Sequence, residues 1–118
     1  MNNQVPEAPE VPQVYRVGTV VEHSWGYDQT NIDFWQIVGR SAKFVTLRRI
    51  ASEIVPTPDA AWMTGRSVPD IGNFLPNVSP IRRKVIFGRG TEIGVGSPNS
   101  CGWAQLWDGK PSNWSAYA

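Results

Sequence analysis

Residues 34–50, FWQIVGRSAKFVTLRRI, contain the pattern that most limits the fold. An aromatic and β-branched run, Phe34–Val38, is followed after a few residues by a second run, Lys43–Ile50. In the second run, Val45 and Leu47 alternate with Phe44, Thr46 and Arg48, which is the period of a half-buried strand. Ser41-Ala42 between the runs predicts a tight reversal. We therefore expect this stretch to form an antiparallel β-hairpin.

Further strand-like segments flank this hairpin on both sides. Alternation or β-branched enrichment predicts strands at Val14–His23, Ile81–Phe87, Thr91–Val95 and Cys101–Trp107, and Ser52–Val55 is expected to extend the strand at Lys43–Ile50. Glycine-rich turns at 88–90, 96–100 and 108–109 separate the later segments, and no helical period is strong. This pattern predicts a mostly β fold, either a small bent antiparallel sheet or an SH3-like barrel.

Two proline-rich stretches divide the chain. Residues 1–13 carry a proline at every third position from 6 to 12, which predicts a flexible, disordered arm, either a solvated tail or a docking peptide. Residues 56–80 contain five prolines and predict a long loop that packs over the sheet. We therefore expect a single β domain over residues 14–118.

Composition narrows the class of protein. The chain has 118 residues, 41% of them hydrophobic, and a formal net charge of +1, which favours an ordinary globular core over a polyanion mimic. Its single cysteine rules out an intramolecular disulfide. The first 30 residues lack the pattern of a signal peptide, and no apolar run approaches a membrane span of about 18 residues. These features predict a cytoplasmic protein.

Residues capable of catalysis or metal binding are few. His23, Glu22, Asp28, Asp33 and Cys101 offer metal-binding donors, but they contain no closely spaced His or Cys pair, so we predict no metal site and no cofactor. Cys101 and His23 could form a nucleophilic pair. Cys101 lies among glycines and tryptophans, which favours its interpretation as a small buried hydrophobe.

The most distinctive segment is Ser24–Phe34, SWGYDQTNIDF. Polar side chains framed by aromatic ones on a strand connection are typical of a recognition loop. The alternative is that these polar groups satisfy the backbone N–H groups of a turn. The candidate binding residues in this loop are Trp25, Tyr27, Asp28, Gln29, Thr30, Asn31 and Asp33.

Charge is unevenly distributed. Residues 1–39 hold five acids and one base, whereas 40–49 and 81–90 each hold four bases and no acid. If the two basic segments lie side by side, they form a local positive face. Such a face, with Trp25, Tyr27 or Trp103 as stacking platforms, would suit single-stranded nucleic acid. Its candidate residues are Arg48, Arg49, Arg82, Arg83, Lys84 and Arg89. The alternative is that these side chains lie on solvent-exposed strand faces, balanced by the acids of residues 1–39, and bind no nucleic acid.

The 24–34 loop, together with Val17-Gly18 and Trp107–Pro111 (WDGKP), resembles a group of small uncharacterised proteins of bacteriophages, prophages and mobile elements, notably of actinobacteria. The resemblance covers residues 16–50 and 82–111. Trp35 departs from it, because that position is more often tyrosine in the group. The resemblance implies a phage accessory protein and carries over no catalytic residues.

Three functional classes follow. The first is a non-enzymatic accessory protein that binds a host or phage protein, including as an inhibitor. Its aromatic and arginine side chains are the types favoured at interface hot spots. The second is a nucleic-acid-binding small β-barrel. The third is a small enzyme that uses Cys101 and His23. No membrane partner is expected, and the oligomeric state stays open.

Overall fold

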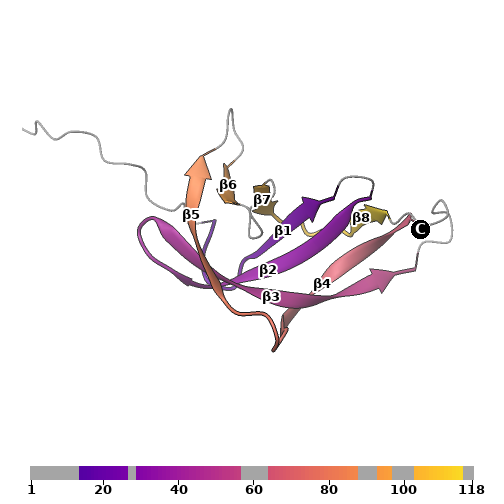
Figure 1. The fold of residues 1–118 in the computed structure, drawn as a ribbon, viewed down its shortest axis with the longest axis horizontal. Helices are drawn as coiled ribbons and strands as arrows, with labels where there is room; N and C mark the ends of the chain where they lie inside the picture. The colour runs from indigo at the N-terminus through magenta and orange to yellow at the C-terminus, as the bar shows by residue number, and fades with distance from the viewer. Residues whose placement is uncertain (1–13, 27–28, 57–63, 88–92, 97–102, 116–118) are drawn as a thin grey trace, which may run out of the picture.

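The protein is described here by a computed structural model that covers residues 14–26, 29–56, 64–87, 93–96 and 103–115 (Figure 1). These residues form strands and turns and contain no helix, which confirms the prediction of a mostly β fold. The strands are β1 (Val20–Trp25), β2 (Asn31–Arg40), β3 (Phe44–Val55), β4 (Thr64–Phe74), β5 (Ile81–Phe87), β6 (Ile93–Gly96), β7 (Trp103–Leu106) and β8 (Ser112–Ser115).

All eight strands belong to one antiparallel sheet that curls strongly on itself. The sheet order is β2-β1-β7-β6-β5-β3-β4-β8, and β3 also pairs directly with β2. This additional pairing closes β2, β1, β7, β6, β5 and β3 into a ring, while β4 and β8 branch off from β3. Ring closure removes the free edges that an open sheet would expose.

The predicted hairpin at residues 34–50 is the β2–β3 pair, and its register explains the core. Trp35 and Ile37 on β2, with Val45 and Leu47 on β3, point into the ring. They pack there against Tyr15, Val21, Val85 and Ala104 from other segments. We call this side of the strands the inner face.

The opposite, outer face of the same strands carries a second and smaller core. Val20, Phe34 and Ile50 are buried there, and the partly buried Phe74 and Trp107 cover them. The rings of Phe34 and Trp107 meet edge to face, with centroids 6.3 Å apart. Because β2 is covered on both faces, the four successive residues 34–37 are all buried, including the polar Gln36.

The prediction that residues 56–80 form a long loop is wrong, because residues 64–74 are the strand β4. Prolines argue against a central strand, but Pro69 lies beside a bulge, where ladder hydrogen bonds are already interrupted. Between the pairs Ile50–Phe74 and Ser52–Pro69, β4 contains more residues than β3 does. Gly72 allows this bulge by adopting a φ of 83°, and its N–H donates to Gln36 Oε1 over 2.8 Å.

The predicted strand at Val14–His23 starts late, since β1 begins only at Val20. Residues before it form a turn in which the Thr19 N–H donates to the Arg16 carbonyl over 3.0 Å and Gly18 has a φ of 99°. Tyr15 is nevertheless fully buried in the inner core, so its burial does not depend on strand geometry. The expected arm at residues 1–13 and the turn at 88–90 lie outside the described residues.

Burial of Tyr15 gives the protein a testable alkaline sensitivity. Desolvation raises the pKa of its phenol above the ordinary value of 10.0. Above pH 10 the unfolded chain therefore loses this proton while the folded chain keeps it, so the free energy of unfolding falls as pH rises. Urea unfolding at pH 9 and pH 11 should show a smaller fall for Tyr15→Phe than for the wild type. Equal falls in both proteins would contradict the assignment.

Candidate functional site

A cleft opens where β2 and β3 separate. The two strands pair from Arg40–Val45 as far as Phe34–Ile50, and beyond this point β3 pairs with β4 instead. β8 pairs with β4 and returns to the start of β2, where Thr30 and Ser115 exchange backbone hydrogen bonds of 3.1 and 3.0 Å. A second, smaller ring of pairings, β2–β3–β4–β8, therefore encloses the gap.

The cleft has a volume of about 300 Å³ and is open to the surface. Its walls come from the end of the β1–β2 hairpin and from the three strands β3, β4 and β8. The lining residues are Trp25, Thr30, Asn31, Ile32, Asp33, Ser52, Ile54, Ser67, Trp114 and Ser115.

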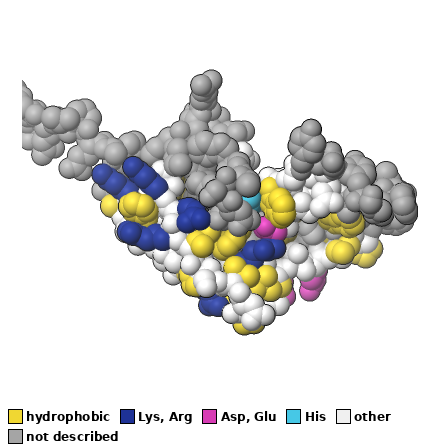
Figure 2. All heavy atoms as spheres, viewed as in Figure 1, with side chains coloured by type: hydrophobic (Ala, Val, Ile, Leu, Met, Phe, Trp, Pro, Cys, Tyr) yellow, Lys and Arg dark blue, Asp and Glu magenta, His cyan; other side chains and the backbone are white. Residues whose placement is uncertain are grey.

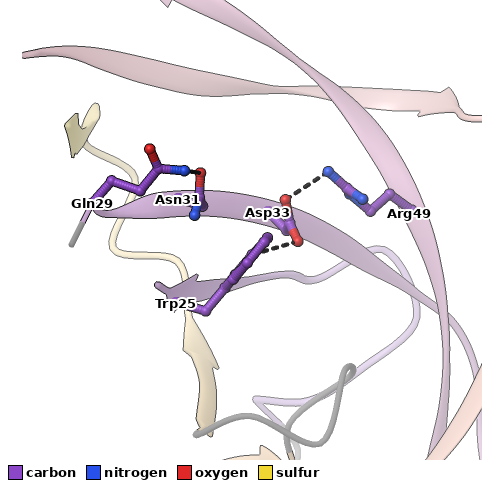
Figure 3. A network of polar contacts seen from close by, with 5 residues as sticks. All are labelled: Trp25, Gln29, Asn31, Asp33 and Arg49. Atoms are coloured by element: carbon purple, nitrogen blue, oxygen red, sulfur yellow. Dashed lines mark hydrogen bonds and ion pairs between the residues drawn. The ribbon is translucent and has the colours of Figure 1, made fainter. Parts of the chain in front are cut away.

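Asp33 organises the fork between β2 and β3 (Figure 3). Its Oδ1 accepts a hydrogen bond from a terminal guanidinium nitrogen of Arg49 over 2.6 Å, and its Oδ2 accepts one from Trp25 Nε1 over 2.8 Å. The Asp33 side chain is only 7% exposed and that of Arg49 is 32% exposed. Charge-assisted bonds in such a poorly hydrated position are stronger than those between neutral groups. They tie β1, β2 and β3 together where the strands begin to diverge.

The same contact sets the position of Trp25. This side chain is 41% exposed, yet its indole N–H is held by Asp33. A half-exposed aromatic ring that is already fixed loses little conformational freedom when a ligand covers it. Trp25 therefore forms a preorganised wall of the cleft.

Trp114 forms another wall and depends on a close approach between β8 and β4. It is paired with Gly65, and a Cβ at that glycine would lie 2.5–3.0 Å from three atoms of the indole ring. Only glycine leaves room for the ring in this position.

Gly65→Ala should therefore displace Trp114 and destabilise the protein by about 1–3 kcal/mol, the usual cost of overpacking. Gly39→Ala is the matched control, because a Cβ there would meet Thr46 only at an ordinary 3.6 Å. Thermal unfolding followed by tryptophan fluorescence would measure both effects. Equal melting temperatures for the two variants would contradict this packing.

The recognition loop expected at residues 24–34 is shorter than anticipated, because β1 continues to Trp25 and β2 begins at Asn31. Of its candidates, Trp25, Thr30, Asn31 and Asp33 line the cleft. Gln29 is exposed and donates from Nε2 to Asn31 Oδ1 over 3.2 Å. Tyr27 and Asp28 lie outside the described residues.

The alternative interpretation, in which the polar groups only satisfy a turn, does not account for the following bonds of Thr30 and Asp33. Thr30 uses its backbone N–H, which also donates to Ser115 Oγ over 2.9 Å. The two carboxylate oxygens of Asp33 likewise accept from side chains of neighbouring strands, Trp25 on β1 and Arg49 on β3. The carboxylate thus holds tertiary structure rather than a local turn.

Six of the ten lining residues were not among the candidates: Ile32, within the 24–34 segment, and Ser52, Ile54, Ser67, Trp114 and Ser115 outside it. As expected, Ser52–Val55 extends the strand at Lys43–Ile50, within β3, but nothing in its sequence indicates a site. The pairing of β3 with β4, of β4 with β8 and of Ser115 with Thr30 brings the five residues outside the 24–34 segment to the loop.

His23 lies fully buried on β1, opposite Asp33 on β2 and Ala104 on β7. Residues 14–26, 29–56, 64–87, 93–96 and 103–115 contain no group of three or more His, Cys, Asp or Glu side chains that could hold a metal ion. Cys101 lies outside the described residues, so its pairing with His23 stays a prediction.

The two basic segments do lie side by side, because β3 pairs with β5. The pairing divides their side chains between faces. Arg82 is opposite Thr46 and Lys84 is opposite Phe44, on the outer face, which Arg48 shares by alternation. Arg83 is opposite the inward-pointing Val45. By the same alternation Arg49 lies on the inner face, where it binds Asp33, and Arg89 lies outside the described residues.

Comparison with known protein families, curated proteins and solved structures gives no match to this chain. Its described residues contain no helix that is long and apolar enough to cross a membrane.

The Asp33 contact predicts a specific stability loss. Asp33→Asn keeps the size of the side chain but removes its charge, so the bond to Arg49 weakens and the guanidinium loses its counter-charge. We expect a loss of about 2 kcal/mol, since hydrogen bonds to charged groups are worth about 1.5–3 kcal/mol. Glu53→Gln, at an exposed position of β3, is the control and should change stability by less than about 0.5 kcal/mol. Urea unfolding of both variants measures the difference, and equal losses would contradict the role of Asp33.

Proposed function

We propose that this chain is a non-enzymatic binding protein whose cleft accepts an extended segment of a partner protein. The observation that carries the proposal is the composition of the cleft, in which four apolar side chains stand beside four hydroxyl groups and one amide. An extended peptide offers the matching chemistry, namely apolar side chains and backbone N–H and C=O groups.

The apolar part of the cleft is unusually exposed. Ile54 is 72% exposed and Trp25 is 41% exposed, and Trp114 lies beside them in the same cleft. Exposed apolar groups that gather in one place often mark interaction sites, and tryptophan is enriched at interface hot spots. Burial of Ile54 and Trp25 by a partner would supply the favourable free energy of binding.

The polar part of the cleft is suited to a peptide backbone. Ser52 and Ser67 each bring a hydroxyl group to the lining. Ser115 Oγ accepts from the Thr30 N–H and Asn31 Oδ1 accepts from Gln29, so these two side chains offer mainly their O–H and N–H donors. These groups lie on strands that are fixed by pairing with their neighbours. A partner segment would therefore meet hydrogen-bonding groups in preset positions, which lowers the entropic cost of binding.

The resemblance of residues 24–34 and 107–111 to small phage proteins supports a partner from the host cell or the phage. On this proposal the chain acts in the host cytoplasm by occupying a surface of that partner, including as an inhibitor. The complete burial of His23 supports a non-enzymatic role, because a substrate would not reach its imidazole in this conformation.

The test compares two exposed isoleucines. Ile54 lines the cleft, whereas Ile71, 59% exposed on the β4 bulge, does not. A yeast-displayed library of random peptides should yield, on the wild-type protein, binders that share an apolar or aromatic residue. Ile54→Glu should weaken these binders at least tenfold, about 1.4 kcal/mol, and Ile71→Glu should leave them unchanged.

Two results would overturn the proposal. One is a library that yields no specific binder. The other is a set of binders that respond equally to Ile54→Glu and Ile71→Glu. Circular dichroism of both variants, which carry the same change at exposed strand positions, ensures that unfolding is not mistaken for loss of binding.

A further inference from the structure

The outer face of β3 and β5 carries a second group of side chains that the cleft does not use. It consists of Phe44, Thr46 and Arg48 on β3 and of Arg82 and Lys84 on β5, with Phe74 of β4 next to Arg48. We call this set the basic outer face. Figure 2 shows Lys and Arg side chains interleaved with hydrophobic ones over the part of the molecule where Figure 1 places β3 and β5.

The charge of this face is not neutralised locally. Residues 34–52 and 71–91 contain no aspartate or glutamate. Among the described residues, Arg48, Arg82 and Lys84 form no ion pair with a carboxylate, in contrast to Arg49 on the inner face. A near-neutral protein thus has one surface on which positive charge is concentrated.

Two of the guanidinium groups are already oriented. Arg82 lies over the ring of Phe44 with its Cζ 4.1 Å from the ring centroid, and Arg48 lies over Phe74 at 4.3 Å. Such cation–π contacts hold the arginine side chains against the sheet and reduce the entropy that binding would otherwise cost. Arg82 is exposed, whereas Arg48 is half-buried with its Nε covered, so the Arg82–Phe44 pair is the more accessible of the two flat, positively charged surfaces.

We propose that the basic outer face binds single-stranded nucleic acid. Its three cations contact phosphates, and the Arg–Phe pairs provide flat surfaces on which unpaired bases stack, as arginine and aromatic side chains do in other single-strand binders. An acidic protein segment would satisfy the charge but would leave the flat surfaces unused. A duplex would offer phosphates but keep its bases stacked inside, so the single strand fits both features of the face.

This site is separate from the cleft. Ile54, in the cleft, is eight residues along β3 from Thr46, which corresponds to about 26 Å at 3.3 Å per residue. The aromatic partners also differ from those expected from sequence, because Trp25 is held at the cleft by Asp33. Loss of one binding activity would therefore not imply loss of the other.

The experiment measures fluorescence anisotropy of a labelled 20-nucleotide oligo-dT and of a duplex of equal length, from 50 to 200 mM NaCl. Three phosphate contacts predict a slope of about −2 in log affinity against log salt for the single strand, and thus about a twentyfold loss over this range. The single strand should bind more tightly than the duplex at every salt concentration.

Variants assign the binding to this face. Arg82→Gln removes one contact and should make the salt slope shallower by about 0.7. Lys84→Glu should weaken binding further, because it reverses a charge at an exposed position. Arg66→Glu is the matched control: it is exposed on β4, opposite Val55 at the far end of β3, and should leave affinity within twofold.

Three outcomes would overturn the proposal. They are no saturable binding at 50 mM NaCl, equal affinity for single strand and duplex, and an equal loss in Lys84→Glu and Arg66→Glu. Arg82 and Lys84 lie outside both cores, so Arg82→Gln and Lys84→Glu are expected to give the circular dichroism spectrum of the folded protein. If Arg82→Gln alone unfolds, the comparison of Lys84→Glu with Arg66→Glu still tests whether the basic outer face binds the single strand.

Discussion

The ion pair between Asp33 and Arg49 is the contact on which the candidate site depends, because it lies where β2 and β3 stop pairing. A carboxylate that is only 7% exposed needs a counter-charge and hydrogen-bond donors, and Arg49 and Trp25 provide them from the two neighbouring strands. The strands can therefore diverge without leaving a charge buried alone. The divergence opens the cleft, and the bond to Trp25 fixes one of its walls.

The β2–β3 hairpin is shared by two rings of strand pairings, and this sharing explains the burial pattern. The N-terminal half of β3 pairs with β5 and closes the larger ring around the inner core, whereas its C-terminal half pairs with β4 and helps to close the smaller ring around the cleft. One long strand thus connects a rigid core to an open site. The proposed peptide cleft and the basic outer face lie at different ends of this strand, so the two proposed activities use different side chains of the same sheet.

Several elements were predictable because their signals are local. Alternation at Val45 and Leu47 and the turn at 41–42 predicted the hairpin, and the candidates Trp25, Thr30, Asn31 and Asp33 do line the cleft. The prediction of a loop at β4 was wrong, because Pro69 argued against a strand. A bulge can accommodate a proline, and the bulge is visible only once β4 is paired with β3. The charge pattern also placed Arg49 and Arg83 in one basic face, although alternation in paired strands turns them away from Arg48, Arg82 and Lys84.

By itself the sequence determined that the chain is mostly β and, in segments that alternate such as 44–48 and 81–85, which side chains share a face, because a two-residue period is a property of the local backbone. The tertiary structure alone decided that Thr30 meets Ser115, 85 residues away, and that Trp114 packs on Gly65. Such pairings depend on which distant edges find each other when the whole sheet curls and buries its two cores. No short stretch of sequence contains that choice, and the cleft exists only because of it.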